Sequence, residues 1–533
     1  MSKLKNSIFP VLILSVVSVS SYAQPVKRSF LDGVVFAPKE TTLVLQKDGV
    51  EDLSITAPAN GNADFSSKPF KFPNSYLDGT PYTLTVKSAS AGQTCKVEKG
   101  ARGTIGLSPG FVRIGCDYTY ELLSRSTDNA KFGTFYESSA PVVGGDIAEE
   151  GRYVAFLSSA VGLGNSLGKK RQILWRDRNS GVTKLVSIGM NGVEGNGDSF
   201  APSISADGQS VAFESYATNL VPIDTNAVRD IFVWDAKTNT VTAVSTGAGE
   251  IETNAESFEP VISGDGTLIA FSSGASNLAP GVDGINTINV FLKKVDSGQS
   301  PILISVDPKT KKGVGGSRPS ISDDGSKVAF YSFASTLVAD DKNNLWDIFL
   351  YDSNNPKLKR LSLTSSGAER DQGTESASRV VAPSISGDGS FVAFATTAAN
   401  MVEGDTNKSQ DVFVVNAGSG QVKRVSLGKE GIQGVGDSPI GQGEKIGISY
   451  DGSLIAFSTS ATNLGGDIIL KNIHSGEIRA ISTGGGRGVG PPAVSRNGGY
   501  VIFGSGSRLD SRFVSSGIFA QFTGLTRCRF CIQ

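Results

Sequence analysis

Residues 319–330 read PSISDDGSKVAF, and this stretch decides the predicted fold. Its Asp324-Gly325 turn separates a short polar run from the apolar run Val328-Ala329-Phe330, a strong β-hairpin signal. An Asx-Gly or Gly turn followed by a short apolar run occurs seven times, and the equivalent glycines are Gly151, Gly208, Gly266, Gly325, Gly389, Gly452 and Gly498. The steps between them are 57, 58, 59, 64, 63 and 46 residues, a period typical of propellers or solenoids.

Each copy divides into four predicted strands. In the second copy they span 202–205, 211–215, 230–235 and 241–245, and β-branched and aromatic residues favour strand over helix. The seventh copy has a third strand at 517–522 but no fourth, so we expect 120–124 to complete it and remove the open edge. The sequence therefore predicts an all-β fold, with a seven-bladed β-propeller of four-stranded antiparallel blades over residues 118–525.

The recurring P-x-I-S-x-D-G-x-x-V-A-F pattern, quoted above from residues 319–330, resembles the WD40-like propeller repeat of the TolB family. That resemblance covers some four hundred residues. It implies the fold and a periplasmic or exported setting. It implies no activity, because propellers of this kind serve many functions.

The amino terminus predicts export. Lys3 and Lys5 precede an apolar run at 8–19, and Ser21-Tyr22-Ala23 provides the small residues that a signal peptidase reads. We expect a signal peptide at 1–23 and cleavage before Gln24. The run is shorter than the roughly 20 residues of a membrane span, so we expect a periplasmic or secreted protein without a membrane span after cleavage.

A separate piece, residues 24–117, lacks the repeat. Strand-like runs at 42–45, 53–55, 70–72, 82–86 and 111–114 alternate with turns, the pattern of a small β-sandwich. This piece is similar to a short Ig-like module of bacterial surface proteins.

The four cysteines fall into two pairs. In an exported chain, Cys95 and Cys116 are expected to form a disulfide that closes a loop of about 20 residues. Cys528 and Cys531 form Cys-x-x-Cys in the tail at 526–533. Their alternatives are a terminal disulfide, a pair of thiols or a redox motif.

Composition excludes several functions. The 50 Lys and Arg residues balance 51 Asp and Glu residues at a net charge of −1, so nucleic acid is not an expected partner. The single histidine, His474, is expected in an outer turn, which argues against a Ser-His-Asp triad and against His-rich metal sites.

Long connections gather on one predicted face of the propeller, where binding usually occurs. Three of them carry Asp-x-Asn-x-x-x-Asp before a third strand, and these candidate calcium ligands are Asp224, Asn226, Asp230, Asp341, Asn343, Asp347, Asp405, Asn407 and Asp411. The pattern lacks the glycine and distal glutamate of an EF-hand. The alternative is that Asp and Asn shape the turns through their own backbone.

The loops that enter the inner strands provide a second candidate site. A mixed acidic and hydroxyl lining is expected around the mouth of a central channel, from Asp198, Ser199, Glu256, Ser257, Ser317, Arg318, Glu375, Arg379, Asp437 and Ser438. Such a lining suits a peptide or a sugar, and carboxylate pairs at a suitable separation also perform glycosidic acid–base chemistry.

Two functions remain open from the sequence. The first is a non-enzymatic exported platform that binds a protein or glycan of the cell envelope. The second is a carboxylate-based hydrolase or lyase at the channel mouth, with or without Ca²⁺. The lack of a usable histidine and of a nucleophile motif favours the first.

Overall fold

A computed structural model describes residues 28–38, 42–56, 65–89, 93–99, 101–106, 112–118, 121–124, 138–144, 151–284, 287–371, 381–439, 445–482, 491–505 and 517–522. The chain forms two compact units, Met1–Thr119 and Tyr120–Gln533. Across the described ranges, no helix has the length and apolar character needed to cross a membrane.

The first unit consists of two four-stranded sheets, with strand orders β4-β1-β8-β6 and β3-β2-β5-β7. Its strands are β1 Arg28–Pro38, β2 Thr42–Lys47, β3 Glu51–Thr56, β4 Phe65–Leu77, β5 Pro81–Ala89, β6 Gln93–Lys99, β7 Arg102–Thr104 and β8 Val112–Tyr118. Both sheets contribute to one core, in which Val35, Phe72 and Ile114 of one sheet pack with Leu43 and Leu45 of the other. This is the predicted small β-sandwich.

The sequence did not predict β1, because Asp32-Gly33 resembles a turn. The ladder between β1 and β4 has a register shift between Phe30 and Asp32 instead. A Cβ atom on Gly33 would lie 2.2 Å from the Val112 carbonyl oxygen of β8, so glycine allows the two strands to pair closely.

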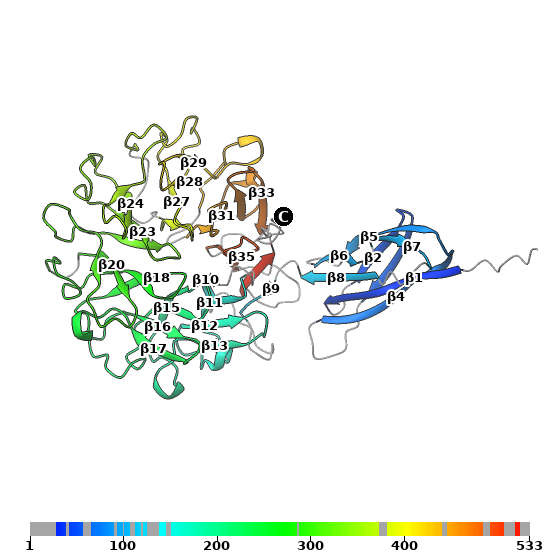
Figure 1. The fold of residues 1–533 in the computed structure, drawn as a ribbon, viewed down its shortest axis with the longest axis horizontal. Coiled ribbons are helices and arrows are strands. Elements are labelled where there is room, and N and C mark those ends of the chain that lie inside the picture. The colour runs from blue at the N-terminus through cyan, green and yellow to red at the C-terminus, as the bar shows by residue number, and fades with distance from the viewer. Residues whose placement is uncertain are drawn as a thin grey trace, which may run out of the picture. The chain divides into compact units, whose positions relative to one another are not determined.

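The second unit contains seven described four-stranded sheets, arranged as blades around a ring (Figure 1). Blade 1 is β10 Ser138–Gly144, β11 Tyr153–Ser158, β12 Gln172–Asp177 and β13 Thr183–Leu185; blade 2 is β14 Ser199–Ile204, β15 Ser210–Ser215, β16 Asp230–Asp235 and β17 Thr240–Ala243; blade 3 is β18 Ser257–Ile262, β19 Leu268–Ser273, β20 Asn289–Lys294 and β21 Ile302–Leu303; blade 4 is β22 Ser317–Ile321, β23 Lys327–Ser332, β24 Asp347–Asp352 and β25 Lys359–Arg360.

The remaining blades follow the same order. Blade 5 is β26 Ser384–Ile385, β27 Phe391–Thr396, β28 Asp411–Asn416 and β29 Val422–Arg424; blade 6 is β30 Gly447–Ile448, β31 Leu454–Ser458, β32 Ile468–Asn472 and β33 Ile478–Ser482; blade 7 is β34 Ala493–Val494, β35 Tyr500–Ser505, β36 Gly517–Phe522 and β9 Glu121–Leu122. Short 3₁₀ turns occur at Leu163–Asn165, Met190–Gly192, Ala248–Glu250, Lys429–Gly431 and Thr462–Leu464. The predicted closing strand is present, since Leu122 pairs with Phe519 and Glu121 with Ala520.

Alternation of side chains in the second strand explains how blades stack. In the Val211-Ala212-Phe213 run, Val211 and Phe213 face the core shared with blade 1, which also holds Ala155. Ala212 faces the opposite core, where it packs against Phe271 of blade 3. A small residue on one side and large residues on the other, repeated in successive blades, lets neighbouring sheets approach and interdigitate.

The Asp-Gly turns link the blades. Asp207 accepts hydrogen bonds from the Ser205 hydroxyl (2.7 Å) and the Gln209 amide (2.9 Å), while Gly208 adopts a left-handed φ of 69°. The amide beside this turn, that of Ala206, donates to the Gly264 carbonyl of the next blade at 2.8 Å. The recurring motif therefore forms the hairpin and joins it to its neighbour.

The inner strands differ from the prediction. The predicted strand 202–205 of blade 2 begins three residues earlier, and its ladder shifts register between Phe200 and Ser203. Ala201 has φ 46° at this bulge, and Glu259 and Arg318 have φ 57° and 56° at the equivalent positions of blades 3 and 4. A bulge redirects the side chains that follow it, and proline after the bulged residue hid this strand from the sequence pattern.

Candidate functional site

Two faces of the propeller differ in their connections. Tight turns join the first strand of each blade to the second and the third to the fourth, whereas long loops join the second to the third and the fourth to the next blade. We call the side that carries these long loops the long-loop face. The predicted Asp-x-Asn residues all lie in or next to these loops.

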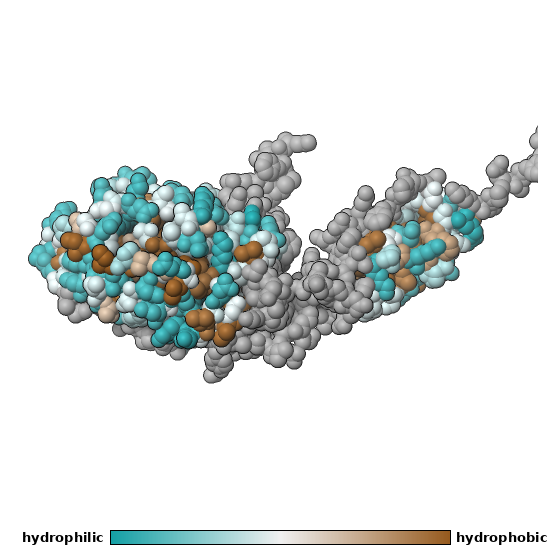
Figure 2. Space-filling model, turned by 90° about the horizontal axis from the view of Figure 1, so that it is seen from below, coloured by the Kyte–Doolittle hydropathy of each residue, from teal (hydrophilic) through white to brown (hydrophobic). Residues whose placement is uncertain are grey.

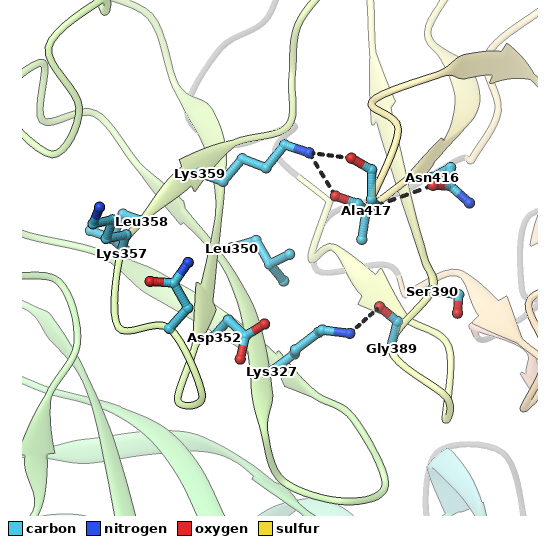
Figure 3. Close-up of a pocket in the computed structure, with 12 residues that line it drawn as sticks. Lys327, Leu350, Asp352, Lys357, Leu358, Lys359, Gly389, Ser390, Asn416 and Ala417 are labelled. Carbon is cyan, nitrogen blue, oxygen red and sulfur yellow. Dashed lines mark hydrogen bonds between the residues drawn. The ribbon is translucent and has the colours of Figure 1, made fainter.

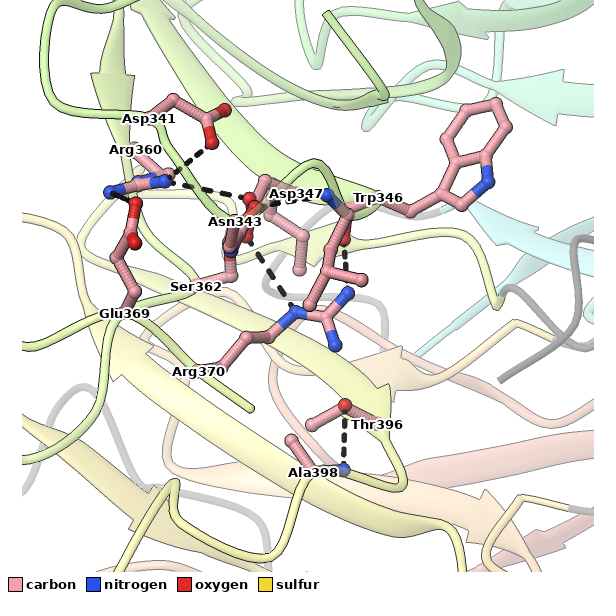
Figure 4. Close-up of polar contacts among 12 residues, drawn as sticks. Asp341, Asn343, Trp346, Asp347, Arg360, Ser362, Glu369, Arg370, Thr396 and Ala398 are labelled. Atoms are coloured by element: carbon pink, nitrogen blue, oxygen red, sulfur yellow. Dashed lines mark hydrogen bonds and ion pairs between the residues drawn. The ribbon is translucent and has the colours of Figure 1, made fainter. Parts of the chain in front are cut away.

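In blade 4 the Asp-x-Asn loop surrounds an arginine (Figure 4). Arg360 Nη1 lies 2.9 Å from Asp341 Oδ1 and 3.6 Å from Asp347 Oδ2, and Nη2 lies 3.1 Å from Glu369 Oε1. The Arg360 and Asp341 side chains are 5% and 2% exposed. Burial, followed by the charge of Asp347, raises the pKa of Asp341, and Arg360 opposes that shift.

Blade 5 repeats the arrangement. Arg424 Nη1 lies 2.8 Å from Asp405 Oδ1 and 3.6 Å from Asp411 Oδ2. Asn407 Nδ2 donates to Asp411 Oδ2 at 2.9 Å, and its Oδ1 accepts the Ser409 amide at 3.1 Å. The asparagine therefore shapes the loop, as the alternative interpretation predicts, and a guanidinium is the cation that contacts the two carboxylates.

Blade 2 has the same loop frame. Asn226 Nδ2 donates to Asp230 Oδ2 at 2.9 Å, and Asn226 Oδ1 accepts the Val228 amide at 3.1 Å. The other Asp230 oxygen accepts the hydroxyls of Ser245 (2.6 Å) and Thr253 (2.7 Å). Burial raises the pKa of Asp230, and these hydrogen bonds oppose the shift. Among the described residues, no group of three or more His, Cys, Asp or Glu side chains is arranged to hold a metal ion.

The second predicted site divides into two parts. Its serines Ser199, Ser257 and Ser438 are fully buried and hydrogen-bond to hydroxyls of the neighbouring strand at 2.6–2.9 Å. These three hydrogen bonds lie within single blades, and the side chains do not line an exposed surface, a correction to the expected hydroxyl lining. The pattern could not distinguish them, because buried and exposed serines look alike in a loop.

The charged members of that site make ion pairs or cap backbone amides. Asp198 accepts the Arg171 amide at 2.8 Å and contacts its guanidinium at 3.1 Å, while Asp437 accepts the Gln410 amide at 3.0 Å. Ser317 begins β22 and is partly buried. Glu375 and Arg379 lie outside the described residues.

Glu256 belongs to a cluster that includes a residue the sequence did not single out. Arg229 bridges Glu214 Oε1 (2.9 Å) and Glu256 Oε2 (3.0 Å), and the Tyr216 hydroxyl donates to Glu256 at 3.1 Å. Glu214 is 5% exposed and its pKa is raised by burial, with Arg229 opposing the shift. The equivalent position, directly after the apolar run, is leucine, serine, tyrosine, alanine or glycine in the other blades, which was the one available signal.

Charged groups of the consecutive blades 2, 3 and 4 are linked through the inner strands. Glu214 Oε2 accepts the bulge amide of Glu259 at 2.6 Å, and Glu259 Oε2 accepts the bulge amide of Arg318 at 2.8 Å. Desolvation lowers the pKa of Lys445, next to blade 6, while the charges of Glu259 and Glu214 act against it. The two acids therefore support the strained bulges of the inner strands.

A cavity of about 450 Å³ lies between blades 4 and 5, among the tight turns on the side opposite the long-loop face (Figure 3). Two of its three lysines make hydrogen bonds between the blades: Lys359 Nζ donates to the Ala417 and Gly418 carbonyls at 2.7 and 3.0 Å, and Lys327 Nζ donates to the Gly389 carbonyl at 3.3 Å. These lysines tie the two blades together. His474 is exposed in the turn between β32 and β33, where the sequence predicts it.

The chain matches no protein-family model and no curated protein. Several solved structures match the chain at TM-scores below 0.5. The oligogalacturonate lyase of Vibrio parahaemolyticus matches with TM-score 0.46 and 12% identity over 84% of this chain and 100% of that chain. The β-propeller domain of the Trilobed protease from Pyrococcus furiosus matches with TM-score 0.42 and 14% identity, over 72% and 95%.

TolB from Acinetobacter baumannii matches with TM-score 0.34 and 14% identity, over 85% of this chain and 78% of that chain. At these identities and TM-scores the matches assign no activity to this chain.

Proposed function

We propose that this protein is an exported, non-enzymatic platform whose long-loop face binds a protein partner in the cell envelope. The observation that carries the proposal is the distribution of exposed apolar side chains on the propeller. Eleven large ones lie in the long loops: Val161, Leu167, Met190, Val193, Tyr216, Ile223, Ile251, Ile288, Phe333, Ile432 and Val435. Of those on the described propeller surface, only Ile302 lies elsewhere, on a fourth strand.

Single exposed apolar side chains are ordinary, but their collection on one face is typical of an interaction surface. Figure 2, turned by 90° from the ring view of Figure 1, shows that hydrophobic groups are set among hydrophilic ones on the side seen from below. Loops on a rigid scaffold are also where binding usually occurs. A glycan remains the other partner class for this face, with its polar contacts made by the loop carboxylates and amides.

Export supports this role. We propose that residues 1–23 are removed as a signal peptide and that the mature chain acts in the periplasm or outside the cell. In the first unit, Cys95 of β6 lies directly opposite Cys116 of β8 in the antiparallel register. We propose a disulfide between them, which an oxidising compartment allows.

The test compares the size of the native complex in envelope extracts. The double variant Ile223→Asp with Ile251→Asp places charge on the long-loop face, and Ile302→Asp is the matched control because Ile302 is also exposed. We expect wild type and control to migrate in a larger complex and the double variant to migrate alone. A complex that survives the double variant, or that the control disrupts equally, contradicts the proposal.

A second candidate is a carboxylate-based hydrolase or lyase at the ring centre, with or without Ca²⁺. The observation that favours it is Glu214, a buried carboxyl with a raised pKa near Lys445. Glu214→Gln keeps the hydrogen bond to the Glu259 amide and removes the acid. If the wild type cleaves an acidic polysaccharide and Glu214→Gln does not, the protein is an enzyme. If neither protein shows activity, the platform function stands.

A further inference from the structure

The blade 2 loop lacks the arginine that its counterparts hold. In blades 4 and 5 the arginine lies two positions before the serine that donates to the third-strand aspartate: Arg360 before Ser362 and Arg424 before Ser426. In blade 2 that serine is Ser245, and the residue two positions before it is Ala243. An alanine methyl therefore stands where two related blades place a guanidinium.

The groups that would contact this guanidinium are retained. Asp224 and Asp230 correspond to the two aspartates of the other loops, and Glu252 corresponds to Glu369 of blade 4. The correspondence is geometric, because the Thr225 amide donates to Glu252 at 2.7 Å and the Lys342 amide donates to Glu369 at 2.7 Å. Oδ1 of Asp224 is buried and has no hydrogen-bond partner among the described residues.

Blades 1 and 3 avoid this imbalance, whereas blade 6 keeps the third-strand carboxylate, Asp467, with Ala480 at the arginine position but has no Asp-x-Asn loop. Blade 1 has Gln172 and Leu185 at the aspartate and arginine positions, and blade 3 has Asn289 and Leu303. Where the cation is missing in these two blades, the third-strand carboxylate is missing as well. Blade 2 keeps both carboxylates of the loop without the cation.

A cavity fills the vacant position. It measures about 360 Å³ and is lined by Ala243, Asp224, Asp230, Glu250 and Glu252, with apolar walls that include Phe232. This volume is within the range of small-ligand sites, roughly 300–1,000 Å³.

Apolar residues flank the cavity on the long-loop face. Ile223, which lines it, is 73% exposed, and Ile251, between its two glutamates, is 61% exposed. The cavity therefore lies within the proposed docking face.

The charges around Asp224 agree with an absent cation. Burial, then the charges of Asp230 and Glu252, raises the pKa of Asp224 to about 6. Lys293 of blade 3 does not replace the arginine, since its ammonium donates to the Thr246 carbonyl at 2.8 Å and interacts with Glu250.

The geometry favours an organic cation over a metal. The Asn226 amide directs its N–H at Asp230 Oδ2 and its oxygen at a backbone amide, so this side chain offers no oxygen to a hard cation. Separate acceptors on two sides of one space suit the planar fork of a guanidinium.

We propose that the blade 2 cavity binds a guanidinium group. That this guanidinium belongs to an arginine side chain of the docking partner rests on the proposed platform function. The binding of a guanidinium by the cavity is independent of that function.

The probe is ethylguanidinium, which contains the atoms that arginine carries beyond the alanine Cβ, and N-ethylurea is its neutral isostere. We expect ethylguanidinium, but not N-ethylurea, to raise the unfolding temperature of the mature full-length chain saturably, with Kd on the order of 1 mM. Ala243→Arg should abolish this effect because the new side chain fills the cavity. Asp224→Asn, which keeps the shape, should weaken binding at least tenfold.

Arg424→Ala in blade 5 is the positive control, since it creates the same vacancy; ethylguanidinium should raise its unfolding temperature further than that of wild type. Equal effects of ethylguanidinium and N-ethylurea on wild type would overturn the proposal, as would binding that persists in Ala243→Arg or in Asp224→Asn. Saturable Ca²⁺ binding that displaces ethylguanidinium would also overturn it, in favour of a metal site. Loss of the envelope complex without loss of ethylguanidinium binding would contradict the platform function alone.

Discussion

Replacing Arg360 by alanine is predicted to destabilise the propeller by about 3–5 kcal/mol, the usual cost of leaving a buried charge without its partner. The variant removes contacts to Asp341 at 2.9 Å, Asp347 at 3.6 Å and Glu369 at 3.1 Å. The side chains of the two aspartates are 2% and 0% exposed, so water cannot replace the guanidinium. The contact to Glu369, which is 32% exposed, contributes little to this estimate.

The measurement is urea unfolding followed by tryptophan fluorescence. Arg479→Ala is the control, because its ion pair with Glu477 is exposed on both sides and should contribute less than about 1 kcal/mol. Arg360→Met separates charge from volume, since it fills the space without neutralising the aspartates. The reasoning is refuted if Arg360→Ala costs no more than the control, or if Arg360→Met restores the wild-type stability at neutral pH.

Three further predictions follow. The fold raises the pKa of Asp224 from its ordinary value of 3.8 to about 6, so its stabilising contribution is complete below pH 3.8 and is lost as pH rises through 6. Asp224→Asn should therefore gain stability relative to wild type between pH 4 and 7 in unfolding titrations, and a constant difference would contradict this. Gly208→Ala should lower the free energy of unfolding by about 2–4 kcal/mol, because its φ is 69° and a Cβ would lie 2.1 Å from the Tyr153 ring. Gly249→Ala, whose Cβ would meet nothing within 4 Å, should lower it by about 1 kcal/mol. Equal losses of stability in the two variants would refute the packing argument. Cys95→Ser should lower the stability of the first unit by about 3 kcal/mol, and thiol-reactive labelling of both Cys95 and Cys116 in the native exported chain would contradict the disulfide.

The repeat predicted the blades because its signals are local. An Asp-Gly turn and an adjacent apolar run lie within twelve residues, and their hydrogen bonds and packing repeat the same way in each copy. The closing strand was also predictable, because Glu121-Leu122 resembles a fourth strand and blade 7 lacks one nearby. The bulges of the inner strands were not, since they depend on acids such as Glu214 reaching across from the preceding blade.

The site was predicted only in part. The sequence singled out the Asp-x-Asn loops, but it attributed their carboxylates to calcium or to turn formation. Arg360 and Arg424 lie 19 residues beyond Asp341 and Asp405, and they reach the loop only because they pair with Phe349 and Phe413 in the register of the outer ladder. The significance of Ala243 likewise requires that register, since alanine carries no chemical signal of its own.

The measurement that tests the central claim most directly is photocrosslinking in living cells from a reactive residue placed at Ile223, beside the blade 2 cavity, with the same residue at Ile302 as control. A docking long-loop face predicts an adduct of defined mass from position 223, none from position 302, and a weaker adduct from position 223 when Ala243→Arg fills the cavity. Equal adducts from both positions, or an adduct from position 302 alone, would contradict the assignment of the long-loop face as the binding surface.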